Sequence, residues 1–273
     1  MTTGFQNLHT HTTYCDGTLS TEEMLKAALA SGCDSIGFSE HSYVPFDIYY
    51  SMDFDSSLKY IDDVNALKDK YKGQIEVFLG LEQDYYTDVA PEGLDYKIGT
   101  LHYAAIGEGQ YISVDAGVKH QKQMVDDYFK GDYYSLAESY FSVFSNIMKK
   151  TNADIIGHFD LVAKYNIDRS LFDEAHPRYI AAALGAMDEI MKDCKLFEVN
   201  TGAMYRLGKI EPYPSVFLLK ELQKRGGEVI LSSDSHDSPS LCYKFAETME
   251  LLKSCGFKYI KRLMENGFVD VGI

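Results

Sequence analysis

Short apolar runs rich in β-branched and aromatic residues alternate along the chain with polar segments whose apolar positions recur at helical spacing. The runs predict seven strands, at residues 5–9, 35–41, 75–84, 96–103, 154–160, 196–201 and 228–235. The polar segments predict helices at residues 21–31, 56–71, 135–150, 177–192, 214–225 and 239–254. Residues 108–131 follow neither pattern well, and we expect a loop or lid plus a helix there. This alternation is typical of an α/β fold with a parallel sheet and right-handed crossovers.

The first predicted helix carries signals at both of its ends. Ser20 and Glu23 form an S-x-x-E capping box, and Gly32 stands where a helix C-terminal glycine belongs. Seven strand–helix units fit either an open doubly wound sheet or a barrel. The phosphate-binding patterns G-x-G-x-x-G and G-x-x-x-x-G-K-[ST] are absent, which counts against the common nucleotide-binding sheets. Without a repeat or a Pro/Ser-rich linker, we expect a single domain over residues 1–273.

Composition and charge narrow the function classes. The chain has 45% apolar and 13% aromatic residues, which excludes a disordered protein. Its 41 acidic residues outnumber 26 basic ones, giving a formal net charge of −15, so we expect no nucleic-acid track. No apolar stretch approaches the roughly 18 residues of a membrane span, and we expect no membrane partner. The oligomeric state has no readable signal.

The cysteines and the N-terminus bear on the cellular compartment. Five cysteines are present, an odd number, and no two of them form a C-x-x-C pair. This pattern is therefore unlike that of a zinc ribbon or a disulfide framework, and we expect free thiols. The first residues lack a basic segment followed by an apolar run, so we expect no signal peptide. Together these features predict a cytoplasmic protein.

Candidate chemistry collects at the ends of the predicted strands. Six of the eight histidines lie at or just past the carboxyl end of a strand, and three carboxylates share these ends. The nine residues are His9, His11, Asp16, His41, Glu82, His102, His158, Asp234 and His236. In parallel α/β folds and barrels, sites form at these ends, so the side chains are expected to converge.

Taken singly, a histidine near a strand end is more often a hydrogen-bonded structural residue than a ligand. The joint pattern favours a multinuclear metal site instead. Histidine and carboxylate without thiolate suit Zn²⁺, Mn²⁺ or Fe²⁺, and nine ligands exceed the needs of one ion, which indicates two or three. Two neighbouring ions can hold a hydroxide and polarise a phosphoryl oxygen. The competing motifs G-x-S-x-G and H-E-x-x-H are absent.

The motif set resembles the PHP domain, named for polymerase and histidinol phosphatase, and in length its stand-alone L-histidinol phosphate phosphatase branch. The resemblance covers residues 9–236 and rests on these motifs: His9-x-His11, Asp16, Glu40-His41, Gly80-Leu81-Glu82, Gly99-Thr100-Leu101-His102-Tyr103, Gly157-His158-x-Asp160, Glu198-Val199-Asn200-Thr201 and Ser233-Asp234-Ser235-His236. It implies a distorted (β/α)7 barrel with the metal site at the C-terminal ends of its strands.

The resemblance also implies three divalent metal ions and a ligand set for each. The first ion takes His9, His11, Glu82 and Asp234. The second shares Glu82 and adds His102 and His158. The third takes Asp16, His41 and His236.

The activity expected from this resemblance is hydrolysis of a small phosphate ester, L-histidinol phosphate being the best single candidate. A hydroxide bridging two ions would attack phosphorus, and Asp234 would orient it or take its proton. Asp160 is the candidate acid for the leaving group, or a support behind the site, because it lies two residues past His158 and so on the same strand face. Arg206 is the stronger candidate for binding phosphate, and Lys164 the weaker.

Two alternatives remain at this point. The chain could act on another small phosphate ester, a nucleotide or a nucleic-acid 3′ end. It could also be a catalytically inactive domain that only binds metal or partners. An inactive version usually loses ligands, whereas every expected ligand position is filled here.

Overall fold

Seven parallel strands form the centre of the molecule in the computed structural model, which describes residues 4–87 and 90–273. The sheet order follows the chain order. The strands are β1 (Phe5–Asn7), β2 (Cys33–Phe38), β3 (Glu76–Asp84), β4 (Tyr96–Thr100), β7 (Ile155–Ile156), β8 (Leu196–Asn200) and β9 (Glu228–Ser232). A parallel bridge between Thr10 and Ser235 joins the two outer strands just past their carboxyl ends. The sheet is thus a nearly closed barrel, which confirms the predicted distorted (β/α)7 architecture.

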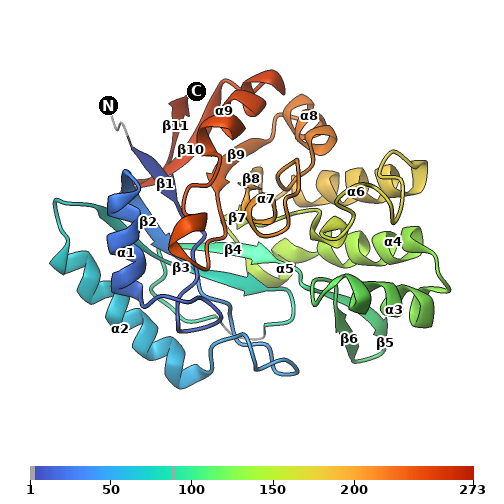
Figure 1. Cartoon of the computed structure of the whole chain (residues 1–273), viewed down its shortest axis with the longest axis horizontal. Coiled ribbons are helices and arrows are strands. Elements are labelled where there is room, and N and C mark those ends of the chain that lie inside the picture. Colours follow the sequence, from blue (N-terminus) through green and yellow to red (C-terminus); the bar gives the residue numbers. More distant parts are fainter. Residues whose placement is uncertain (1–3, 88–89) are drawn as a thin grey trace.

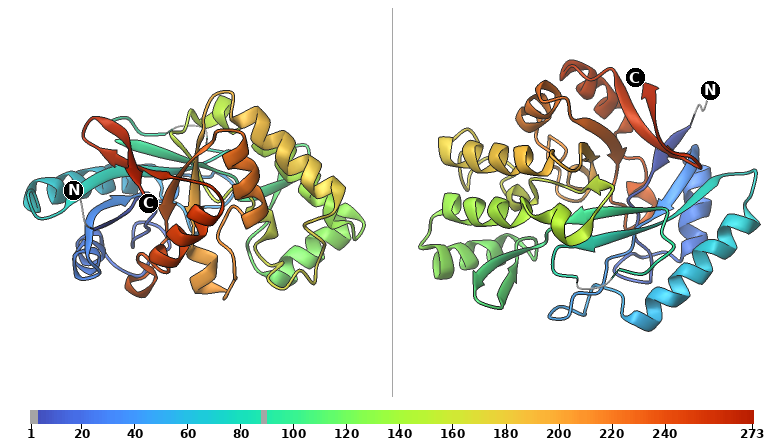
Figure 2. Two further views of the ribbon diagram at one scale, coloured as in Figure 1. Left: turned by 90° about the horizontal axis from the view of Figure 1, so that it is seen from above. Right: turned by 180° about the vertical axis from the view of Figure 1, so that it is seen from behind.

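Helices surround the barrel, with α1 and α2 on one side and α3, α4 and α6 on the other (Figures 1 and 2). Their bounds are α1 (Thr21–Ala30), α2 (Phe54–Lys70), α3 (Val118–Phe129), α4 (Tyr133–Phe144), α5 (Ile147–Thr151), α6 (Pro177–Ile190), α7 (Gly202–Arg206), α8 (Val216–Lys224) and α9 (Phe245–Ser254). Two 3₁₀ turns, η1 (Leu161–Ala163) and η2 (Ser238–Ser240), complete the set. The capping box predicted at Ser20 and Glu23 starts α1. Over the described ranges, no helix has the length and apolar character needed to cross a membrane.

Two antiparallel hairpins fall outside the predicted pattern. The first pairs β5 (Tyr103–Gly107), just before the segment at residues 108–131, with β6 (Gln110–Ser113) inside it. The helix expected there is α3, so that part of the prediction is confirmed. The second pairs β10 (Tyr259–Met264) with β11 (Gly267–Gly272) at the C-terminal end.

The C-terminal hairpin covers the opening between β1 and β9, the two outer strands, and lies beside β1 (Figures 1 and 2). Gln6 Nε2 donates to the Leu263 carbonyl at 2.9 Å, and the Leu263 amide returns a bond to Gln6 Oε1 at 2.8 Å. The buried Arg262 donates to the Gly4 carbonyl and to Ser35 Oγ, each at 3.0 Å. These bonds replace the ladder that β1 and β9 do not form with each other.

Tyrosines fill the barrel and its wall where two glycines make room. Tyr96 is buried inside, and a Cβ added at Gly37 or Gly80 would lie 2.3 or 2.2 Å from its ring or hydroxyl atoms. Outside the barrel, the Tyr60 hydroxyl donates to the carbonyls of Phe38 at 2.9 Å and Gly80 at 2.7 Å. Both glycines are therefore required by close approach.

Candidate metal centre

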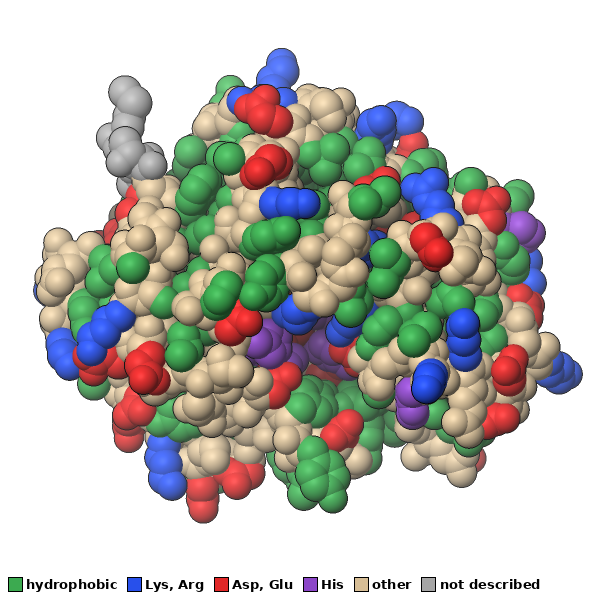
Figure 3. Space-filling model, in the orientation of Figure 1, with side chains coloured by type: hydrophobic (Ala, Val, Ile, Leu, Met, Phe, Trp, Pro, Cys, Tyr) green, Lys and Arg blue, Asp and Glu red, His purple; other side chains and the backbone are tan. Residues whose placement is uncertain are grey.

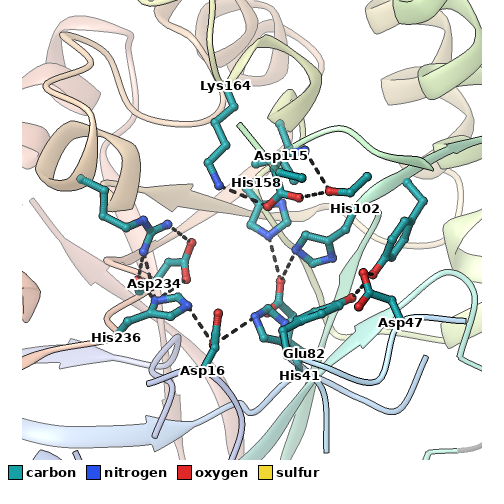
Figure 4. Close-up of a pocket in the computed structure, with 16 residues that line it drawn as sticks. Asp16, His41, Asp47, Glu82, His102, Asp115, His158, Lys164, Asp234 and His236 are labelled. Atoms are coloured by element: carbon teal, nitrogen blue, oxygen red, sulfur yellow. Dashed lines mark hydrogen bonds and ion pairs between the residues drawn. The ribbon is translucent and has the colours of Figure 1, made fainter. Parts of the chain in front are cut away.

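The nine predicted ligands do converge on one cavity at the carboxyl ends of the strands. They arrive from the ends of β1, β2, β3, β4, β7 and β9, and they line or lie beneath a cavity of about 370 Å³. Figure 3 shows histidines at the bottom of a hollow on this face, and Figure 4 shows the predicted ligands that line the cavity, which point toward one another. We call these nine residues the ligand cluster.

Glu82 lies at the centre of the ligand cluster. Its Oε2 is 2.7 Å from His41 Nδ1 and 3.3 Å from His9 Nε2. Its Oε1 is 2.8 Å from His158 Nε2 and 3.3 Å from His102 Nε2. One carboxylate thus faces imidazoles from four strand ends, an arrangement suited to bridging two ions.

Two further carboxylates serve the other side of the cluster. Asp234 Oδ1 lies 3.3 Å from His11 Nε2. Asp16 Oδ1 lies 3.2 Å from His236 Nε2 and 3.6 Å from His41 Nε2. Potential ligand atoms fall into overlapping groups within 4.8 Å of one another, including His11, Asp16, His41 and His236.

The chemistry of the donor atoms fits divalent metal ions. The side chains of His9 and His11 are fully buried, yet Nε2 of each has no hydrogen-bond partner. Glu82 Oε2 has none with hydrogen-bond geometry either, although His41 Nδ1 lies 2.7 Å away. Buried polar atoms without partners are costly, and these three atoms face one another. The neutral imidazole and carboxylate set suits ions such as Zn²⁺.

The pKa values of His9 and His11 depend on burial and on the charges that surround each imidazole. Burial, with the neighbouring His236 and His41, lowers the pKa of His11 to about 3, so its imidazole is a neutral ligand. Burial also opposes charge on His9, but Glu198, Glu82 and Asp234 outweigh it and hold the His9 pKa well above its usual value. Buried carboxylates therefore attract positive charge, as protons on imidazoles or as metal ions that displace them.

Carboxylates behind the cluster orient its imidazoles. Glu198 on β8 contacts His9 Nδ1. Asp84 on β3 accepts from the His102 backbone N–H at 3.0 Å, and its Oδ2 lies 3.1 Å from His102 Nδ1. Such partners fix the ring and its tautomer. No role was predicted for either residue from the sequence, although Glu198 begins the Glu198-Val199-Asn200-Thr201 motif and Asp84 shares the strand face of Glu82.

Both predicted cationic residues line the cavity. Arg206 donates from Nη2 to Asp234 Oδ2 at 2.7 Å and from Nη1 to the Asp234 carbonyl at 2.5 Å. Lys164 Nζ lies 3.2 Å from Asp115 Oδ2. Arg206 is thereby fixed beside the ligand cluster, whereas Lys164 extends toward Asp115 (Figure 4).

The structure does not bring Asp160 into the cavity. Its side chain is fully buried elsewhere, and Oδ2 accepts from the Ser215 amide at 3.0 Å. The expected strand face fails because β7 contributes only Ile155–Ile156 to the ladder, and the chain bends and turns from His158 onward. Asp160 thus does not face the cavity, and its role as leaving-group acid or as a support behind the site stays a prediction. Burial raises its pKa to about 6.

The cavity also has a wall of acidic and aromatic side chains, for which no role was predicted from the sequence. Asp47 accepts a hydrogen bond from the Tyr103 hydroxyl at 3.1 Å, and that hydroxyl lies 2.7 Å from the Tyr50 hydroxyl. Asp115 completes this wall and accepts from the Ser113 hydroxyl at 2.7 Å. Asp115 follows the β5–β6 hairpin, which the hydrophobic pattern did not reveal.

Fold and site together define a class of protein: a parallel α/β barrel with a histidine–carboxylate metal centre at the carboxyl ends of its strands. The family model for the PHP domain matches residues 7–202, and the chain belongs to that family.

Similar proteins extend the comparison over almost the whole chain. A protein of Deinococcus radiodurans named "Probable histidinol-phosphatase" is 27% identical over 265 residues, covering 93% of this chain and 95% of its own. The "Histidinol-phosphatase" of Bacillus subtilis is 24% identical, covering 89% and 97%. A crystal structure of histidinol phosphate phosphatase from Lactococcus lactis, complexed with Zn, L-histidinol and phosphate, matches with a TM-score of 0.68 and 22% identity over 97% of this chain and 98% of that one.

Proposed function

We propose that this chain is a metal-dependent phosphomonoesterase that hydrolyses L-histidinol phosphate to L-histidinol and phosphate. The observation that carries the proposal is the cavity itself, which sets the ligand cluster and Arg206 against an acidic and aromatic wall. The names of the relatives that match nearly end to end support the same substrate. We also propose that residues 1–273 form one domain, since the seven parallel strands, from β1 at one end of the chain to β9 near the other, share one barrel and β10 packs on β9.

The proposed cofactor is a set of three divalent ions, Zn, Mn or Fe. Their proposed ligands are His9, His11, Glu82 and Asp234 for the first, Glu82, His102 and His158 for the second, and Asp16, His41 and His236 for the third. Grouped ligand atoms support the first and third sets, since His9, His11 and Asp234 form one group and Asp16, His41 and His236 lie together in another. The second set is supported by Glu82 Oε1, which lies 2.8 Å from His158 Nε2 and 3.3 Å from His102 Nε2. When bound, such ions supply positive charge for phosphate oxygens and lower the pKa of water to produce a nucleophile.

Protein side chains complete the phosphate site in this proposal. Arg206 has a planar guanidinium at the cavity wall, and its two hydrogen bonds to Asp234 fix the position of the guanidinium relative to that carboxylate. Asp234, whose Oδ1 faces His11, is the proposed proton acceptor in the reaction. Lys164 adds a second cation to the lining of the cavity.

The acidic and aromatic wall accounts for the organic part of the substrate. L-Histidinol carries an ammonium and an imidazole, and both suit carboxylate and aromatic partners. Asp115 is suited to this role because nearby cations, Lys164 foremost, outweigh burial and hold its pKa well below the usual range. Tyr50 and Tyr103 provide the adjoining aromatic surface.

The test is a comparison of kcat/KM across phosphate esters, made on protein whose metal content has been measured. The panel contains L-histidinol phosphate, a nucleoside monophosphate, a sugar phosphate, phenyl phosphate and single-stranded DNA. We expect L-histidinol phosphate to give the highest value and at least two ions per chain. A higher kcat/KM for a nucleotide or for DNA would overturn the proposed substrate. Less than one ion per chain, with no activity after metal reconstitution, would overturn the proposal that the chain is a metal-dependent enzyme.

Two variants sharpen this test. We expect Asp234→Asn to abolish turnover in a folded chain. We expect Asp47→Asn to raise KM for L-histidinol phosphate while leaving KM for phenyl phosphate unchanged, because phenyl phosphate has no cation to recognise. An equal change for both esters would remove the acidic wall from substrate recognition.

A further inference from the structure

Two thiols meet outside the ligand cluster, where β2 approaches the segment that links β9 to α9. Cys33 is the first residue of β2, and Cys242 lies between η2 and α9. Their sulfur atoms are 2.9 Å apart although the residues are separated by 209 positions in the chain. Both are free cysteines. This contact therefore joins two distant parts of the chain.

The backbone around this pair is held from both sides. The Cys242 amide donates to Ser233 Oγ at 3.2 Å, and Ser233 Oγ accepts in turn from Asn7 Nδ2 at 2.7 Å. Cys33 is buried in the ladder of β2, whereas Cys242 is only half-buried and gives the pair a route to solvent. A disulfide bond is about 2.05 Å long, so closing this gap needs a sulfur movement of only about 0.9 Å.

The charge around the pair also favours reaction. The hydrogen bond with Cys242 lowers the pKa of the Cys33 thiol, and the Arg262 guanidinium acts in the same direction against the effect of burial. The pKa of Cys242 is raised by its bond to Cys33 and by burial. Cys33 therefore carries the thiolate character, and Cys242 holds the proton between them.

We propose that Cys33 and Cys242 are a modification site that closes to a reversible disulfide when a hydroperoxide oxidises the pair. The Cys33 thiolate attacks one peroxide oxygen, the O–O bond breaks, and hydroxide leaves with the electron pair. The Cys242 sulfur then attacks the Cys33 sulfenic acid, forming the S–S bond and releasing water with the Cys242 proton. For hydrogen peroxide, two thiols are oxidised and one peroxide is reduced to two waters.

The other cysteines lack this geometry. Cys15 donates to Glu40 at 2.6 Å beside the ligand cluster, and Cys194 contacts backbone carbonyls. Among residues 4–87 and 90–273, the bond between Cys33 and Cys242 is the one hydrogen bond that joins two thiols. A disulfide between Cys33 and Cys242 would be a covalent crosslink across the opening between β1 and β9. It would constrain the unfolded chain by closing a very long loop.

The experiment treats the full-length, zinc-loaded protein with one equivalent of hydrogen peroxide and then alkylates the remaining thiols. We expect alkylatable cysteines to fall from five to three, with a crosslinked peptide that contains Cys33 and Cys242. The melting temperature should rise by roughly 5–10 °C and return to its starting value with dithiothreitol. Zinc is used because it has no redox chemistry of its own.

Matched variants separate this site from general oxidation. Cys33→Ser and the less buried Cys242→Ala should each abolish the crosslink and the shift in melting temperature, whereas Cys194→Ser should retain both. Oxidation that instead consumes Cys15, joins two chains, or leaves the Cys33 and Cys242 peptides alkylated would overturn the proposal. A crosslink without a change in melting temperature would overturn the claim that the disulfide stabilises the fold.

Discussion

Glu198→Gln tests whether the carboxylates behind the ligand cluster set its affinity for metal. Glu198 is buried on β8, where Oε1 contacts His9 Nδ1 and the Ser232 hydroxyl. Oε2 accepts from the His158 backbone N–H at 2.8 Å and from Asn200 Nδ2 at 3.0 Å. Glutamine keeps the shape but replaces one oxygen with an NH₂ group. At the Oε2 position the NH₂ group would face two donors, the His158 N–H and Asn200 Nδ2. At the Oε1 position it would face the Ser232 hydroxyl and His9 Nδ1, and that nitrogen carries the proton when Nε2 binds a metal.

The size of the effect follows from these contacts. With the amide nitrogen toward His9, that imidazole loses the acceptor that fixes its ring, and with the nitrogen toward His158 the backbone at that ligand is displaced. Loss of such an orienting partner typically weakens metal binding about 10–100-fold, which corresponds to about 1.4–2.8 kcal/mol. The pKa of His9, held up partly by Glu198, should fall, and weaker proton competition offsets part of this loss.

The assay is competition for zinc between the protein and a chelator of known affinity at pH 7, with circular dichroism to confirm folding. Glu265→Gln is the matched control, since Glu265 is exposed in the β10–β11 turn and far in sequence from the ligands. We expect the zinc Kd to rise for Glu198→Gln alone. A folded Glu198→Gln variant whose zinc Kd stays within twofold of the parent protein would refute this reasoning.

Three further substitutions test the fold by urea denaturation. Gly80→Ala should lower the free energy of unfolding by about 3 kcal/mol or more, since its Cβ would lie 2.2 Å from the Tyr96 ring; a loss below 1 kcal/mol would contradict that packing. Arg262→Ala should lower the free energy of unfolding by about 3 kcal/mol, because it removes the buried bonds that hold the C-terminal hairpin over β1. An unchanged free energy of unfolding would show that these bonds do not stabilise the fold. Ser20→Ala should lower the free energy of unfolding by about 1 kcal/mol, because it removes the side-chain cap at the start of α1. An unchanged free energy of unfolding would mean that Glu23 alone caps the helix.

The sequence predicted the barrel and the ligand cluster for one physical reason. Parallel strands bring their carboxyl ends to the same face, so residues such as His9, Glu82 and Asp234 could be placed together without knowing their distances. Strand positions were recoverable because buried strands in such folds are short, apolar and β-branched. The helix ends were less accurate, as the predicted helix at residues 135–150 is two helices, α4 and α5.

Asp160 shows where this reasoning fails. The predicted strand continues through residues 154–160, but only Ile155 and Ile156 pair with neighbouring strands. Hydrophobicity reports burial, and Phe159 and Asp160 are buried without being in a strand. The alternation of side chains therefore stops before Asp160, and its carboxylate turns toward Ser215. Periodicity cannot locate the last ladder bond, on which the direction of every following side chain depends.

The net charge of −15 has a different meaning once the buried carboxylates are placed. Asp16, Glu82 and Asp234 belong to the ligand cluster, and further acids lie directly behind it. Burying that many carboxylates is costly unless positive charge accompanies them. The nearby cations do not meet this need, because Arg206 is paired with Asp234 and Lys164 with Asp115. In the proposed function, capture of a phosphate ester therefore depends on metal ions, whose charge a count of lysines and arginines leaves out.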